Sequence, residues 1–395
     1  MMLRIRAFSL RLVQPVSAIA IALSFSFSLI AAENPGLPRT IAWSAYPTGT
    51  GGYSQAVAIG SILRREYGVN LRVIPGRNDV SRLAMLLAER VHFSAGGSEA
   101  VYAQEGVLNF ASRIWGPQPL RALMSNFSAS CSFTLAAADD ANIDSIADIK
   151  GKRVTWVQGS PSLNNALTAL LAYGNLTWDD VERVEVGGYN ASIEAVINNR
   201  ADVVGGACNS PPFLRLEASP RGLKFISFPH DDLEAVQRTR SLLPWYVTHI
   251  ATEGPTLPPE GIQVFTSAYP LLVGLDTADD TLVYNLVKVM HEQFDDYKDA
   301  APGAGGWLME RQKFESAFIP YHPSAIRYFR EIGVWDDAAQ ANQEANLFRQ
   351  QILHDAWETY KATAPNTPGE YEQGWFAARA KALADEGLLT LADNI

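Results

Sequence analysis

The sequence is poor in the residues and motifs that mark enzymes. Six histidines are spread singly along 395 residues, without the spacing of metal ligands. There is no G-x-S-x-G nucleophile elbow and no H-E-x-x-H pair. The only two cysteines, Cys131 and Cys208, lack a local protease signature and a nearby histidine for zinc. The sequence therefore predicts no catalytic centre, no metal site and no cofactor.

Charged residues are also scarce, and positive charge is the scarcer kind. Asp, Glu, Lys and Arg make up 19% of the chain, hydrophobic residues make up 47%, and the net charge is -10. This composition excludes a disordered chain and allows a sizeable core. An acidic surface repels phosphate backbones, so nucleic acid is excluded as a partner. The overall charge does not fix the charge of a ligand, because a cleft can carry the opposite sign.

The N-terminus has the order of a secretory signal peptide. Three arginines and no acidic residue precede an apolar stretch at 16–30, which ends in Ala31 and Ala32. The stretch is shorter than the roughly 20 apolar residues that span a bilayer. A retained membrane anchor is the alternative, but no stop-transfer flank follows. We expect residues 1–32 to be removed and the mature protein to lie in the periplasm.

Strand and helix patterns alternate twice along the chain. The first unit has strands at 40–46, 70–74 and 91–95, separated by helices at 54–67 and 79–90. The second has strands at 153–157, 181–186 and 203–207, separated by helices at 163–173 and 191–199. This order predicts an open α/β sheet in each unit.

We expect the two units to form two lobes joined by a two-strand hinge. The expected segments are 33–138 for the first part of lobe 1, 139–240 for lobe 2, 241–335 for the return to lobe 1 and 336–395 for a C-terminal helical extension. The hinge strands are placed near 132–138 and 270–276. The fold class is therefore α/β, with two lobes.

The two cysteines are expected to be free thiols. On these boundaries Cys131 lies in the first lobe and Cys208 in the second, so a bridge would tether the lobes. A bridge also needs Cα atoms within about 7 Å. The alternative is a disulfide, which an oxidising compartment permits.

Small-residue turns precede three of the expected helices, at 49–52, 96–98 and 159–162. Helix N-termini expose unpaired N–H groups and a positive dipole end, which suits a carboxylate. Arg77 and Arg82 offer a bidentate clamp for it. The alternative is an ordinary helix start, with Asn78 or Asp79 as N-cap and Arg82 solvated or paired with Asp79.

Glu99 is expected to cap a helix and not to bind ligand. The predicted ligand-binding residues are Thr48, Gly49, Thr50, Gly51, Tyr53, Arg77, Asn78, Arg82, Ser98, Gly159, Ser160, Asn164, Asn209 and Tyr246.

Four motifs in sequence order resemble the TAXI family, the solute receptors of TRAP transporters. They are TGTGGY at 48–53, PGRNDV at 75–80, DIKGKRV at 148–154 and YHPSAIRYF at 321–329. The resemblance implies a type II periplasmic-binding fold and a separate permease driven by an ion gradient. It also implies a small organic anion as ligand, such as a dicarboxylate, a 2-oxoacid or an acidic amino acid.

The chain departs from the family at Arg77-Asn78-Asp79, where many members have a Gly/Ser-rich turn, so no named substrate carries over. The alternative functions are a periplasmic enzyme or a ligand sensor on the same fold.

Overall fold

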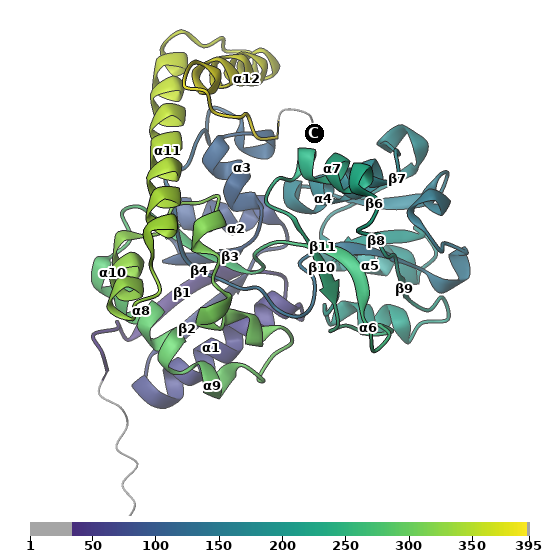
Figure 1. Cartoon of the computed structure of the whole chain (residues 1–395), viewed down its shortest axis with the longest axis horizontal. Helices are drawn as coiled ribbons and strands as arrows, with labels where there is room; N and C mark the ends of the chain where they lie inside the picture. Colours follow the sequence, from purple (N-terminus) through teal and green to yellow (C-terminus); the bar gives the residue numbers. More distant parts are fainter. Residues whose placement is uncertain (1–33, 393–395) are drawn as a thin grey trace, which may run out of the picture.

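The computed structural model describes residues 34–392, and the expected signal peptide lies outside this range. The chain forms two α/β lobes side by side, with a helical hairpin standing on the first of them (Figure 1). Each lobe is built on its own five-stranded sheet. The predicted two-lobed α/β fold with a C-terminal helical extension is therefore confirmed.

The sheet of the first lobe has the strand order β2-β1-β3-β12-β4. Its strands are β1 (Thr40–Ala45), β2 (Asn70–Pro75), β3 (Phe93–Gly96), β4 (Leu120–Ser125) and β12 (Leu271–Leu275). β1 pairs in parallel with β2 and β3, whereas β12 runs antiparallel between β3 and β4. All of β1 except its first residue is buried, as expected for a parallel strand covered on both faces.

The sheet of the second lobe follows the same plan, in the order β7-β6-β8-β5-β9. Its strands are β5 (Thr134–Ala137), β6 (Arg153–Val157), β7 (Glu182–Val186), β8 (Val203–Gly206) and β9 (Lys224–Phe225). β6 is parallel to β7 and β8, and β5 is antiparallel to β8 and β9. In each sheet, three neighbouring strands are therefore parallel. The strand next to a lobe crossing, β12 in the first sheet and β5 in the second, runs antiparallel beside them.

Helices surround both sheets. The first lobe contains α1 (Gly51–Tyr67), α2 (Asp79–Leu87), α3 (Glu99–Glu105), α8 (Asp280–Glu292), α9 (Phe294–Tyr297) and α10 (Pro323–Glu331). The second lobe contains α4 (Pro161–Tyr173), α5 (Tyr189–Ile197), α6 (Pro212–Glu217) and α7 (Leu233–Leu242). The local sequence determines where some of these helices begin or end. Helix α4 begins at Pro161, whose fixed φ suits the first position of a helix. Helix α1 ends at Gly68, which adopts the left-handed conformation.

The chain crosses between the lobes twice, and the crossings differ in detail from the expected hinge strands. β5 pairs only within the second sheet and β12 only within the first. The connecting segments are therefore 126–133, between β4 and β5, and 267–270, which leads into β12. The expected strands 132–138 and 270–276 flank these segments and do not span both sheets.

The prediction of two free cysteines is wrong, because Cys131 and Cys208 form a disulfide. Cys131 precedes β5 and Cys208 follows β8, its antiparallel neighbour. The Cys208 amide also donates to the Cys131 carbonyl at 3.3 Å, and the Cα atoms are 5.2 Å apart. The error came from assigning β5 to the first lobe. The bridge lies at one end of the β5–β8 pair, two interior strands of the second sheet, and does not join the sheets to each other.

Packing also moves the expected boundary at residue 241. β10 (Val247–Ala251) and β11 (Ile262–Thr266) form a separate antiparallel pair. Phe265 of β11 belongs to the core of the second lobe, and Ala251 and Val264 pack on the disulfide. The return to the first lobe therefore begins after β11.

The C-terminal extension is a hairpin of α11 (Asp337–Thr363) and α12 (Pro368–Asp385). Trp357 and Trp375 form a small core between the two helices, at a ring-centroid distance of 4.8 Å. The hairpin stands on α3 of the first lobe (Figure 1).

Candidate functional site

The two lobes meet where the first turns of α2 and α4 face each other. Asn78, the N-cap of α2, donates its side-chain amide to the Gln158 carbonyl at 3.1 Å. The Val80 amide donates to the Gly159 carbonyl at 3.3 Å. In α/β proteins, ligands bind beside the carboxyl ends of parallel strands, and these turns follow β2 and β6. The structure therefore describes a closed form of the cleft between the lobes.

A buried ionic cluster lies beside this contact; we call Asp79, Arg82, Glu99 and Ser162 the interlobe cluster. The Arg82 guanidinium donates to Asp79 Oδ1 at 2.7 Å and to Glu99 Oε1 at 2.6 Å. Asp79 Oδ2 accepts from the Ser162 amide at 2.9 Å and from the Ser162 hydroxyl. The three charged residues are at most 2% exposed. With both carboxyl groups ionised, the cluster carries a net charge of -1.

The pKa of Asp79 is raised, and burial is the main cause. Burial and the neighbouring Glu99 carboxylate raise the pKa of Asp79 from 3.8 to about 6, although Arg82 and Ser162 act in the opposite direction. Charged groups are costly to bury unless they are paired, and here one cation serves two carboxylates. Asp79 therefore titrates near neutral pH, in direct contact with the other lobe.

Tyrosines form the remaining wall of the cluster. The Arg82 guanidinium carbon lies 4.2 Å from the centre of the Tyr46 ring, which is a cation–π contact. The ring centroids of Tyr46 and Tyr269 are 5.0 Å apart, and Tyr269 precedes β12. Burial, followed by the Glu99 carboxylate, raises the pKa of the Tyr46 hydroxyl well above its usual range. Tyr46 is therefore neutral and adds no negative charge.

Within residues 34–392, no group of three or more His, Cys, Asp or Glu side chains is arranged to hold a metal ion. Over the same range, none of the helices combines the length and the hydropathy needed to cross a membrane.

Residues 45–333 match the NMT1-like family, a range that includes the second lobe and the first lobe from the end of β1, and that excludes the C-terminal extension. The chain belongs to the NMT1-like family.

Solved structures with a distant likeness to the chain are periplasmic binding proteins and related folds. The aliphatic sulphonate binding protein SsuA of Escherichia coli is 13% identical, over 78% of this chain and 92% of that one, with a TM-score of 0.41. An ancestral arginine-binding protein bound to arginine is 12% identical, over 67% and 97%, with a TM-score of 0.41. A protein from Bordetella bronchiseptica RB50 is 14% identical, over 88% and 98%, with a TM-score of 0.43. The fold assignment rests on the strand order of this NMT1-like chain itself.

The two predicted arginines have different surroundings. Arg82 is buried and already paired with two internal carboxylates, so it is not an open clamp for a ligand. Arg77 is exposed on the loop before α2 and lies near Gly188 of the other lobe. Asn78 caps α2 by accepting from the Ser81 amide at 2.9 Å, while its amide group reaches the other lobe. The alternative of a capped helix start is the correct description of this turn.

The Gly-rich turn before α1 lies at the rim of the cleft. Thr48 and Gly49 are exposed, and the Thr48 carbonyl accepts from the Asn190 side chain of the second lobe at 3.4 Å. The Thr50 hydroxyl donates to the Pro47 carbonyl at 2.7 Å, and Gly51 is buried. Tyr53 is half-buried and packs on the core of the first lobe.

Of the predicted residues in the second lobe, Gly159 and Ser160 form the turn before α4, and Ser160 is buried. Asn164 fastens this turn to β6, because its side chain bonds both the amide and the carbonyl of Val157 at 2.9 Å. Asn209 lies against Gly303 of the first lobe, where an added Cβ would approach its Nδ2 to 2.8 Å.

The last two predicted residues, Ser98 and Tyr246, lie near the second crossing. The Ser98 hydroxyl accepts from the indole N–H of Trp245 at 2.8 Å. Burial raises the pKa of Tyr246, and the nearby hydroxyls of Ser267, Ser132 and Ser98 oppose this rise. These two residues therefore belong to the hinge side of the interface.

Sequence reasoning missed the members of the interlobe cluster other than Arg82. Asp79 was named only in the alternative description, as an N-cap or as the partner of Arg82. Glu99 was expected to cap a helix, and Ser162 was part of a turn without a role of its own. The available signal was an acid at the first position of each of two helices whose preceding turns were expected to line the cleft, where a buried Asp or Glu needs a partner. Nothing local indicated that one arginine would serve both.

Proposed function

We propose that this protein is an extracytoplasmic solute-binding receptor that captures a small organic anion between its lobes and delivers it to a TRAP-type permease. The contact between Asp79 and Ser162 carries the proposal. It places a carboxylate from one lobe on the first turn of α4 in the other lobe. Membership of the NMT1-like family and the motifs quoted above are consistent with it.

Asp79 occupies the position that we assign to a carboxylate group of the ligand. The Ser162 amide is one of the first N–H groups of α4, which have no partner within the helix and face the positive end of its dipole. Asp79 uses Oδ2 for Ser162 and Oδ1 for Arg82. An incoming carboxylate can therefore take the place of Oδ2 at Ser162 while Asp79 keeps its bond to Arg82.

In this proposal the closed form without ligand is held by an internal carboxylate, and the closed form with ligand by the carboxylate of the solute. A ligand with a second polar group has further partners at the rim, where Arg77 and Asn209 lie. Dicarboxylates, 2-oxoacids and acidic amino acids are the candidates. The permease would recognise the closed lobes, because closure changes the relative position of the two surfaces it contacts.

Calorimetry of the mature protein against a panel of these acids tests the proposal. We expect one class to bind, and Ser162→Ala to weaken its binding about tenfold, since one hydroxyl donor to a charged acceptor contributes about 1.5 kcal/mol or more. Ser219→Ala, which removes a hydroxyl that bonds only locally in the second lobe, is the matched control.

Binding of no acid on the panel, or equal affinity in Ser162→Ala, would contradict the assignment of the site. Nuclear magnetic resonance of the same mixtures would detect consumption of an acid, which would favour the enzyme alternative. Uptake of the bound acid by cells that contain the cognate permease tests the transport role separately.

A further inference from the structure

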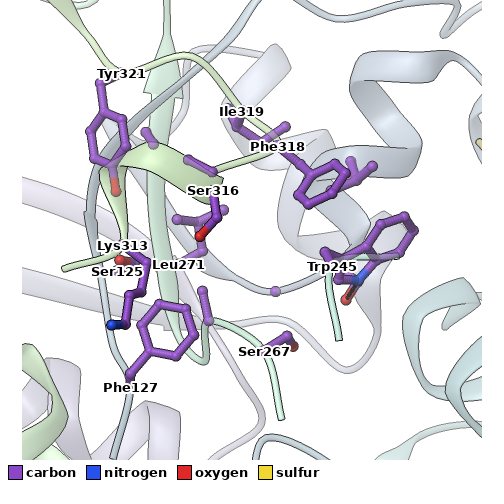
Figure 2. A pocket seen from close by; sticks show the side chains of 16 residues that line it. Ser125, Phe127, Trp245, Ser267, Leu271, Lys313, Ser316, Phe318, Ile319 and Tyr321 are labelled. Carbon is purple, nitrogen blue, oxygen red and sulfur yellow. Dashed lines mark hydrogen bonds between the residues drawn. The ribbon is translucent and has the colours of Figure 1, made fainter. Parts of the chain in front are cut away.

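A small apolar chamber lies at the second crossing, on the side of Ser98 and Trp245 (Figure 2). Its volume is about 70 Å³. The apolar side chains that line it are Val101, Phe127, Trp245, Leu271, Phe318 and Ile319. None of the four residues of the interlobe cluster lines it, so it is separate from the site proposed above.

Both lobes and both crossings contribute to the chamber. Trp245 follows α7 of the second lobe, and its indole N–H bonds Ser98 of the first lobe. Ser267 and Ala268 belong to the second crossing, and Phe127 belongs to the first. Trp245 also packs against Phe318, with ring centroids 5.7 Å apart. The wall of the chamber is therefore complete on this side only while Trp245 is docked on the first lobe.

Three of the serine hydroxyls in the wall have partners in the protein. The Ser125 hydroxyl donates to Gln312 at 3.0 Å, and the Ser267 hydroxyl donates to Ser132 at 3.2 Å. The Ser98 hydroxyl accepts from Trp245. With these groups satisfied, the chamber offers mainly apolar contact to an occupant, and burying apolar surface there is favourable.

Lys313 is the one charged residue among those that line the chamber. In the described part of the chain its ammonium group has neither a salt bridge nor a hydrogen bond, and the side chain is exposed. Lys313 also lines a larger open groove of about 980 Å³ that continues from the chamber and shares Phe127, Trp245 and Phe318 with it. The Lys313 side chain therefore lies at the boundary between the apolar chamber and open solvent.

We propose that this chamber is a second small-molecule site, which binds a short branched aliphatic monocarboxylate. The apolar tail occupies the chamber and the carboxylate pairs with Lys313 at its mouth. The volume sets the size of the tail, because a cavity of about 150 Å³ holds a benzene ring. About half of that volume suits a branched group of three or four carbons and excludes an aromatic ring.

3-Methylbutanoate is the probe for this site, used with the mature full chain in calorimetry. A ligand of so few atoms is expected to bind with Kd between about 0.1 and 1 mM. Lys313→Gln should weaken binding about threefold, because an exposed ion pair contributes less than about 1 kcal/mol. Ser316→Leu, which places apolar bulk at a residue of the lining, should abolish binding. Figure 2 shows Ser316 directed toward the middle of the chamber. The uncharged 3-methylbutan-1-ol should bind about threefold more weakly than the acid.

Two control variants separate this site from the interlobe cluster. Lys381→Gln removes an exposed ammonium on α12, far from the lining, and should leave Kd unchanged. Ser162→Ala should weaken only the ligand of the interlobe cluster. No detectable binding at about 10 mM, or binding lost in Ser162→Ala and retained in Lys313→Gln, would overturn the proposal. Binding of 3-methylbutanoate with no binding of the acid panel would sustain this site and reject the function proposed for the other.

Discussion

Asp79 is the residue on which the chemistry of the cleft depends most. It is buried, it contacts both lobes, and it shares Arg82 with Glu99. Of the other groups that face it, Arg82 favours its ionised form and Glu99 opposes it. Its pKa of about 6 lies above the value of 3.8 for a free side chain. A carboxyl group with a raised pKa binds a proton more tightly in the closed form, so closure gains stability as pH falls through about 6 and loses it as pH rises.

This titration predicts that the affinity for a carboxylate ligand increases as pH falls. At pH 8 the ligand meets the ionised Asp79, whereas at pH 5 Asp79 is protonated and the ligand is still ionised. We expect Kd to fall about tenfold from pH 8 to pH 5, which corresponds to a rise of about one unit in the pKa of Asp79 when the ligand binds. Asp79→Asn should bind with nearly the same Kd at both pH values, and calorimetry at each pH measures this.

Asp385→Asn is the control for that measurement, because Asp385 is an exposed acid on α12. It should keep the pH dependence of the parent. The same pH dependence in Asp79→Asn would contradict the role of Asp79.

At the scale of elements, the disulfide fixes how the first crossing enters the second lobe. It joins Cys131, at the end of segment 126–133, to the residue that follows β8 by two positions, and it closes a loop of 77 residues. A cross-link over a loop of this length typically stabilises a protein by about 2–4 kcal/mol, in large part by restricting the unfolded chain.

We therefore expect the double variant Cys131→Ala and Cys208→Ala to unfold at a lower urea concentration, with a loss of about 2–4 kcal/mol. Thiol titration of the unfolded, unreduced parent should find no free thiol. Two free thiols would contradict the disulfide.

The C-terminal hairpin is attached to the first lobe through a second buried ionic cluster. Glu105, the last residue of α3, is fully buried and accepts from Arg349 of α11 at 2.6 Å and from Arg379 of α12 at 2.6 Å. Trp375 also donates to the Gly106 carbonyl at 2.7 Å. One acid thus holds both helices of the extension against α3.

Glu105→Gln should destabilise the protein by about 3 kcal/mol, because it leaves two buried or partly buried arginines without their carboxylate. The matched control is Glu358→Gln on α11, which breaks only an exposed pair with Lys361 and should change stability by less than about 1 kcal/mol. Urea unfolding measures both. Equal stability of the two variants would mean that other contacts hold the hairpin.

The elements with a strong local pattern could be predicted from the sequence. The expected strand at 40–46 and helix at 163–173 correspond to β1 and α4 within two residues, because burial periodicity and turn residues fix such segments locally. The sheet to which β5 belongs could not be predicted, since a strand of only four buried residues pairs equally well with any neighbour. The error about Cys131 followed from that single strand.

In the site, too, the features set by neighbouring residues could be predicted, and those set by distant residues could not. Asn78 as an N-cap follows from residue type and position. The pair of Arg82 with Asp79 is local, and it was one of the alternatives. The pair of Arg82 with Glu99 depends on the distance between α2 and α3, and the contact of Asp79 with Ser162 depends on the approach of α4, which local patterns do not contain. Sequence therefore indicated the turns that line the cleft and left the charge balance within it undetermined.

For the whole molecule, the function depends on how the lobes approach each other. Gly159 lies at the point of contact: its φ is +68°, and a Cβ there would lie 2.5 Å from Nδ2 and 3.1 Å from Cγ of Asn78 in the other lobe. Asn78 cannot turn away freely, because its Oδ1 caps α2 at Ser81. A methyl group at Gly159 would therefore separate the lobes. Gly151 has a similar φ of +74° and no atom within 4 Å of an added Cβ, so it has the same backbone strain without the obstruction.

We predict that Gly159→Ala prevents full closure, whereas Gly151→Ala does not. Both variants should lose about 1 kcal/mol of stability from the left-handed backbone of a residue that now has a Cβ. Only Gly159→Ala should keep the larger radius of gyration at ligand concentrations that compact the parent, and its Kd should rise at least tenfold, because the ligand then loses the contacts of one lobe. Small-angle X-ray scattering with and without ligand measures the first effect and calorimetry the second. If Gly159→Ala becomes as compact as Gly151→Ala, then the α2–α4 contact is not the one that forms when the lobes close on a ligand.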